Sequence, residues 1–156
     1  MFLTKIALLI LIPIIGSVLI YLARKNENQR EGMSFITAFL LFGVVLNLFN
    51  SSNINGEVVH LVRLFPGVSV SFFYDHLSII FAIVASSLWI VTTLYSMGYM
   101  RGLNEGNQTR FYICFSLAIS ATMGVAFSAN LLTLYIFYEM LSISTYSLVG
   151  HHQDNE

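Results

Sequence analysis

The chain has 156 residues, of which 56% are hydrophobic and only 10% are charged. Its mean hydropathy of +0.76 is too high for a soluble domain of this size, so we predict an integral membrane protein. The net charge of −1, without a basic cluster, gives no indication of a nucleic-acid partner. A single cysteine, Cys114, excludes an internal disulfide and a cysteine metal site within this chain.

The first predicted membrane helix covers residues 3–23. Residues 6–23 form an uncharged apolar run that Arg24 closes. The run is long enough to cross about 30 Å of hydrocarbon, with Lys5 reaching outward to the interface. A cleaved signal peptide is the alternative, but the run is long for one and no A-x-A-like site precedes Arg24.

A second membrane helix is predicted over residues 33–49. The polar stretch 24–32 is expected to form a loop before it, and the turn-forming residues 50–56 end it. Its polar positions within the apolar run are Ser34, Thr37 and Asn47.

Residues 57–74 differ in kind, because they are rich in β-branched and aromatic side chains. Pro66-Gly67 has the residues that a type II turn prefers, and valine alternates with serine just after it. We predict a β-hairpin outside the membrane, stabilised by packing on a neighbour, since an isolated two-stranded hairpin is marginal. An irregular loop is the alternative.

The third membrane helix is predicted over residues 77–97 and is followed by a polar connector, 98–110. Asp75 lies just ahead of it, where an acidic residue favours a helix start. Three other acidic residues are expected to be solvated loop charges: Glu27, Glu31 and Glu105.

The last two membrane helices are predicted over residues 111–128 and 131–150. From Phe111 to Gly150 the only Asp, Glu, Lys, Arg or His is Glu139. A charged side chain at mid-membrane costs roughly 2.5 to 3.5 kcal/mol on insertion scales, and such residues mark ion or proton pathways. We therefore interpret Glu139 as functional. The alternative is a structural residue that is hydrogen-bonded between helices, or protonated and packed.

Hydroxyl groups accompany Glu139 on one face of the fifth helix. Steps of three and four residues from Glu139 reach Tyr135, Ser142 and Tyr146, which could hold water and pass protons. The opposite face is apolar: Leu134, Phe137, Leu141 and Leu148. This chain has no basic residue at matching depth, so a positively charged partner for Glu139 must come from another segment or subunit.

Two adjacent histidines, His151 and His152, follow the last helix and could relay protons at the cytoplasmic mouth. Adjacent histidines on a regular helix cannot both face one metal, and no third ligand is spaced to help, so we predict no metal site. His60 and His76 lie in or beside the hairpin. No Ser/His/Asp arrangement, phosphate-binding glycine loop or cofactor fingerprint occurs, so no cofactor and no active site of its own are predicted.

The positive-inside rule orients these five crossings in the cell membrane, with the amino terminus outside and the carboxyl terminus in the cytoplasm. The hairpin is then on the outer face, where only Lys5 and Arg63 are basic. The remaining basic residues fall on the cytoplasmic side: Arg24, Lys25, Arg30, Arg101 and Arg110.

Four segments together resemble the antiporter-like subunits of respiratory complex I. They are FYDHLSIIFAIV from Phe73, YSMGYM from Tyr95, RFY from Arg110 and SANLLTLYIFYEMLSISTYSLVGHH from Ser128. The same family includes the large subunits of Mrp-type cation/proton antiporters and of membrane-bound hydrogenases. The resemblance covers nearly the whole chain and implies an outer hairpin between the second and third helices. It gives Glu139 the place of the family's fifth-helix glutamate, which pairs with a lysine on a later helix of the same subunit.

Members of this family are much longer and are built from inverted five-helix repeats with broken helices at the ion site. The lysine partner, the broken helices and the second half-channel have no counterpart in this sequence. We therefore expect either a split-gene subunit completed by another chain or a shortened polypeptide, which does not translocate ions by itself.

We expect an all-α membrane protein that contributes Glu139 to proton or sodium translocation in a multisubunit membrane complex. Its expected partners are the lipid bilayer and other membrane subunits, including a chain or segment that supplies a buried lysine. The alternative is a non-translocating structural or assembly subunit, in which Glu139 only anchors a neighbouring helix. An independent small channel is disfavoured, because five helices with one carboxyl leave no lined path across both leaflets.

Overall fold

The computed structural model describes residues 2–51, 58–65, 68–103 and 108–149. Within these ranges, five helices are long and apolar enough to cross a membrane, and two strands form a small sheet. The predicted helical class and the hairpin are therefore confirmed, and the irregular loop is not. The helices are α1 (Phe2–Leu22), α2 (Glu27–Ser51), α3 (His76–Leu103), α4 (Gln108–Ala126) and α5 (Leu131–Val149). The strands are β1 (Val58–Phe65) and β2 (Val68–Phe73).

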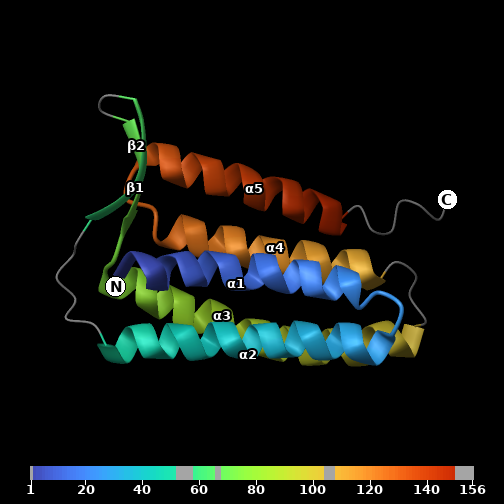
Figure 1. Ribbon diagram of the computed structural model, residues 1–156. Helices are drawn as coiled ribbons and strands as arrows, with labels where there is room; N and C mark the ends of the chain where they lie inside the picture. The colour runs from blue at the N-terminus through green and yellow to red at the C-terminus, as the bar shows by residue number, and fades with distance from the viewer. Residues whose placement is uncertain (1, 52–57, 66–67, 104–107, 150–156) are drawn as a thin grey trace.

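Four of the helices form a closed ring, in which α1 and α3 each contact both α2 and α4. Helix α5 lies outside this ring, against α4 and β2 (Figure 1). The hairpin is at one end of the bundle, which we call the hairpin end. At the other end α1 and α3 finish and α2 and α4 begin, and we call it the connection end (Figure 1).

The ring is held together by apolar side chains and by hydrogen bonds between helices. The fully buried residues include Leu41, Val45, Leu48, Ile6, Leu9, Trp89 and Met123. The Ser116 hydroxyl donates to the Pro13 carbonyl, and the Ser120 hydroxyl donates to the Ile10 carbonyl, each at 2.7 Å. Because lipid is as apolar as leucine, such polar contacts and close packing help membrane helices to associate. These two bonds fix α4 against α1.

Two glycines allow neighbouring helices to approach closely. A Cβ atom added at Gly16 of α1 would overlap the side chain of Thr37 in α2. A Cβ atom added at Gly124 of α4 would overlap the ring of Phe137 in α5. Small residues at helix contacts are typical of membrane bundles. The close packing of α5 on α4 therefore depends on a glycine, which has no side chain, at position 124.

The hairpin is joined to the rest of the chain through β2. Strands β1 and β2 pair antiparallel, with Val59 opposite Phe72. On its other edge, the backbone N–H of Phe73 donates to the carbonyl of Phe127 at 2.7 Å, and that of Ala129 donates to the carbonyl of Ser71 at 2.9 Å. The segment between α4 and α5 thus acts as a short third strand. The predicted need for a supporting neighbour is met by this segment.

The polar loop predicted over residues 24–32 is wrong from residue 27 onward, because α2 already begins at Glu27. The Arg30 N–H donates to the Asn26 carbonyl at 3.0 Å, which starts the helix in the polar region. Helix α3 likewise continues to Leu103, beyond its apolar run. The length of an apolar run indicates how much of a helix lies in the hydrocarbon, and the helix itself can continue beyond that run into the polar interface.

Candidate functional site

The start of α5 is fixed by Asn130. Its Oδ1 accepts hydrogen bonds from the backbone N–H and the hydroxyl of Thr133, at 2.8 and 2.7 Å. Its Nδ2 donates to the Ser69 carbonyl at 2.5 Å and to the Ser71 hydroxyl at 2.7 Å. The buried Thr133 hydroxyl also accepts a hydrogen bond from the Ser71 N–H at 3.0 Å. One asparagine therefore caps α5 and ties it to β2.

The rotation of α5 about its own axis is set by Phe137. Its ring packs against Gly124 of α4 and lies 5.8 Å, centroid to centroid, from the ring of Phe72 in β2. Glu139 follows two residues later, about 200° around a helix with 3.6 residues per turn. The contact of Phe137 with α4 thus turns Glu139 away from the ring of helices.

Glu139 lies near the middle of α5, eight residues after Leu131 and ten before Val149. Its side chain is exposed, and Tyr135, Ser142 and Tyr146 are exposed beside it. The structure therefore brings these four predicted residues together on one uncovered face. Of the residues predicted for the opposite face, three are half-buried and Leu134 is exposed; the half-buried residues are Phe137, Leu141 and Leu148.

None of the four has a hydrogen bond or an ion pair within the described residues. In contrast, Ser144 and Thr145 donate to the carbonyls one turn earlier in α5, each at 2.8 Å. The carboxyl and its neighbouring hydroxyls are thus directed toward a surface that the described part of this chain does not cover.

The histidines form no metal centre in the described part of the chain, where no cluster of three His, Cys, Asp or Glu residues occurs. His60 Nδ1 lies 3.0 Å from the Ser69 hydroxyl across the hairpin, and His76 is exposed at the start of α3. His151 and His152 lie outside the described residues. Their relay role stays a prediction.

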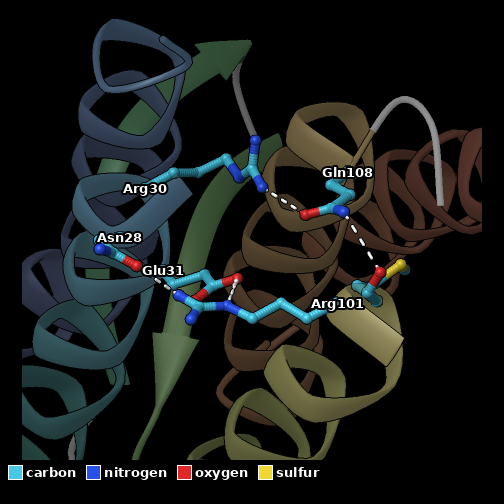
Figure 2. Close-up of polar contacts among 6 residues, drawn as sticks. Asn28, Arg30, Glu31, Arg101 and Gln108 are labelled. Atoms are coloured by element: carbon cyan, nitrogen blue, oxygen red, sulfur yellow. Dashed lines mark hydrogen bonds and ion pairs between the residues drawn. The ribbon is translucent and has the colours of Figure 1, made fainter. Parts of the chain in front are cut away.

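A second polar cluster lies at the connection end, shown in Figure 2. Glu31 of α2 is 3% exposed and accepts two hydrogen bonds from Arg101 of α3, at 3.1 Å from Nε and 2.5 Å from Nη2. Arg101 Nη2 also donates to Asn28 Oδ1 at 2.6 Å. A bidentate arginine–carboxylate pair of this kind fixes the relative position of two helices.

The neighbouring Arg30 joins α2 to α4 instead. Its guanidinium donates to the Gln108 side-chain carbonyl (Figure 2). It also donates to the Thr109 hydroxyl at 3.2 Å and lies 5.8 Å from the centre of the Tyr112 ring. Gln108 in turn donates to the Met100 carbonyl of α3 at 3.3 Å. The connection end is therefore held by a polar network that joins α2, α3 and α4.

The prediction that Glu31 is a solvated loop charge is wrong, because it is buried and paired with Arg101. Glu27 is exposed as predicted, but it lies in the first turn of α2 and not in a loop. Glu105 lies outside the described residues. A signal for Glu31 was present in the sequence. If α2 is extended toward its amino end, Glu31 shares a face with Ser34 and Ala38, which are buried.

Asp75 caps α3 as predicted. Its Oδ1 accepts a hydrogen bond from the Ser78 N–H at 2.8 Å, and the Ser78 hydroxyl bonds the same carboxylate. The Asp75 N–H in turn lies 3.2 Å from the Ser78 hydroxyl. Hydrogen bonding from the Ser78 side chain and backbone lowers the pKa of Asp75 below its ordinary value of 3.8.

The fold defines a multi-pass membrane protein with a hairpin between its second and third helices. The family model described as NADH-ubiquinone oxidoreductase (complex I), chain 5 N-terminus, matches residues 66–112. Na(+)/H(+) antiporter subunit A1 of Staphylococcus haemolyticus is 29% identical over 120 residues, which are 75% of this chain and 15% of that protein. NAD(P)H-quinone oxidoreductase chain 5 of a Picosynechococcus species is 32% identical over 82 residues, which are 53% of this chain and 12% of that protein.

A similar fold occurs in the membrane-bound sulfane sulfur reductase, an archaeal respiratory membrane complex. The match has a TM-score of 0.75 at 16% identity and covers 93% of this chain and 23% of that chain. The predicted resemblance is thus confirmed: the chain is related to the antiporter-like subunits of complex I and Mrp-type antiporters. It spans only a small part of the length of the relatives that it matches.

Proposed function

We propose that this chain contributes its five helices and the carboxyl of Glu139 to a membrane assembly that translocates protons or sodium ions. The observation that carries the proposal is the position of Glu139, near the middle of α5 and on the face that the ring of helices leaves uncovered. Relatives named as a sodium/proton antiporter subunit and as a quinone oxidoreductase chain support the same class of function.

The uncovered face requires a partner, because a carboxylate that faces lipid at this depth is costly. The partner that fits is another membrane segment that carries a lysine or another cation, supplied by a different subunit or by further residues of the same protein. A nearby cation favours the ionised carboxylate, and its withdrawal favours the protonated acid. Alternation between these two states would couple proton uptake and release at Glu139 to charge movement elsewhere in the assembly.

The hydroxyls beside Glu139 supply a route for protons in this proposal. Tyr135, Ser142 and Tyr146 lie within about two turns of Glu139 on the same face. Because a hydroxyl can donate and accept a hydrogen bond, the three can order water between Glu139 and the two surfaces. His151 and His152 are proposed to receive protons beyond the end of α5.

The proposed membrane is the cell membrane, with the amino terminus and the hairpin outside and the connection end in the cytoplasm. Support comes from the connection end, where Arg24 and Lys25 follow α1 and Arg101 lies in the last turn of α3. Single cysteines at positions 25 and 60, in a Cys114→Ser background, test this orientation with a membrane-impermeant maleimide in intact cells. Labelling at 60 and not at 25 is expected, and the reverse pattern would contradict the proposed topology.

Glu139→Gln tests the function, because it keeps the size of the side chain and removes its charge. In the intact complex in sealed vesicles, ion translocation is expected to fall by about tenfold or more, whereas Glu139→Asp, which keeps a carboxyl, should retain a substantial part of it. The amount of assembled complex on a native gel is measured for both variants. If Glu139→Gln assembles normally and transports like the wild type, the translocation role is wrong. If it lowers assembly and transport in proportion, Glu139 is a structural anchor.

A further inference from the structure

An open pocket of about 540 Å³ lies at the connection end, beside the Arg30 part of the polar network. Its walls come from the end of α1, the first turns of α2 and α4, and the turn between α1 and α2. The polar wall includes Arg24, Arg30, Arg110 and Glu27, and the apolar wall includes Tyr21 and Ile113. Among the described lining residues, three guanidinium groups and one carboxylate give a net charge of +2 (three minus one).

Arg30 is the feature of this pocket that most needs a ligand. It is 5% exposed, and its hydrogen-bond partners, the Gln108 side-chain carbonyl and the Thr109 hydroxyl, are both neutral. Its buried Nε has no hydrogen-bond partner in the described part of the chain. A buried charge is costly unless it is paired, so an anion at this position would offset a cost that the described residues leave uncompensated.

A second arginine adds to the same positive wall. The Arg24 guanidinium donates to the Tyr21 hydroxyl at 3.1 Å and lies 4.9 Å from the centre of the same ring. Its partner in the described structure is therefore also neutral. Because α4 begins at Gln108, the positive end of its helix dipole is directed to the same place. The guanidinium N–H groups of arginine and the first backbone N–H groups of a helix are both suited to bind phosphate oxygens.

The depth of the pocket points to the source of the phosphate. The candidate membrane spans Thr4–Leu22, Glu27–Asn50 and Gln108–Ala126 all have one end at this pocket, so it lies at the level of lipid headgroups. Ile113 lies one turn inside the start of α4, where an acyl chain would begin. We propose that this pocket binds an anionic phospholipid, with its phosphate against Arg24 and Arg30 and an acyl chain beside Ile113.

Lipid binding by the purified full chain, with the membrane subunits that accompany it, tests this proposal. Native mass spectrometry in detergent measures the apparent affinity for phosphatidylglycerol and for phosphatidylcholine, and inorganic phosphate is added as a competitor. Phosphatidylglycerol is expected to bind more tightly. Arg24→Gln and Arg30→Gln should each weaken it about fivefold, since one arginine near a membrane surface contributes roughly that factor. Lys25→Gln is the matched control, because Lys25 follows Arg24 but does not line this pocket.

Three results would overturn the proposal. Equal affinities for the two lipids would show that no anionic headgroup is selected. An equal loss in Lys25→Gln and Arg24→Gln would show attraction to diffuse surface charge. Displacement of phosphatidylglycerol by inorganic phosphate at millimolar concentration would show a site for a free anion. Arg24 is exposed, so Arg24→Gln keeps the test decisive even if Arg30→Gln fails to fold.

Discussion

Asn130 gives the sharpest test of how α5 is held in place. Its side chain caps α5 through Thr133 and donates two hydrogen bonds to β2, at Ser69 and Ser71. Loss of a helix cap costs about 1 kcal/mol, and each lost hydrogen bond costs about 0.5 to 1.5 kcal/mol. Asn130→Ala should therefore lower the free energy of unfolding by about 2 to 4 kcal/mol.

Two further variants separate the parts of this effect. Asn130→Asp keeps the oxygen that caps α5 but removes the donor to β2, so its expected loss is about 1 to 3 kcal/mol. Asn26→Ala is the matched control, because Asn26 also directly precedes a helix, yet its side chain bonds only the exposed Gln29. A loss of less than about 0.5 kcal/mol is expected for this control.

Unfolding can be followed by circular dichroism during titration of detergent micelles with sodium dodecyl sulfate. Hydrogen exchange adds a local measurement, since amides in the first turn of α5 should exchange faster in Asn130→Ala while those of α3 do not change. If Asn130→Ala unfolds at the same point as Asn26→Ala, the cap and its strand contacts do not stabilise the fold. If Asn130→Asp is as stable as the wild type, the hydrogen bonds to β2 contribute nothing.

Two more outcomes are expected from the same unfolding assay. Gly124→Ala should destabilise the protein by about 1 to 3 kcal/mol, because the new methyl group overlaps the Phe137 ring. The control Gly43→Ala, where nothing lies within 4 Å, should be neutral or slightly stabilising. Equal effects of the two substitutions would refute the close contact of α4 and α5. The pKa of Asp75 is lowered in the folded protein, so its contribution to stability is present above about pH 4 and is lost as the pH falls through the folded value. The stability of Asp75→Asn should lack this acid-side loss, and parallel pH profiles for the two proteins would show that Ser78 does not hold the ionised carboxylate.

The parts of the fold that sequence predicts well are those with a local cause. The strands of the hairpin follow from the β-branched residues and the alternation after residue 67, whereas the turn predicted at Pro66-Gly67 lies outside the described residues. The cap at Asp75 follows from its place before an apolar run. Glu139 stands out because every residue near it is uncharged. Each of these signals lies within a few residues, where chain geometry and solvation act directly.

The parts that sequence missed depend on contacts between distant segments. The helical period places Glu31 on a buried face, but its pairing could not be predicted, because its partner, Arg101, lies seventy positions later in the chain. The contact between Gly124 and Phe137 likewise becomes evident only when α4 and α5 are placed side by side. Such pairings are set by the three-dimensional arrangement of the helices, which no local pattern encodes.

Four of the hydroxyls inside the ring of four helices are bound to backbone carbonyls. Ser86 and Thr93 donate to carbonyls of α3 itself, at 2.6 and 2.8 Å, and Ser116 and Ser120 donate to carbonyls of α1. A hydroxyl whose proton is bound to a backbone carbonyl is not free to donate it to a neighbouring water, so these groups do not form a relay across the ring. The hydroxyls beside Glu139 have no such bond within the described residues. This contrast supports the proposal that the route for protons lies at the outer face of α5 and not inside the ring.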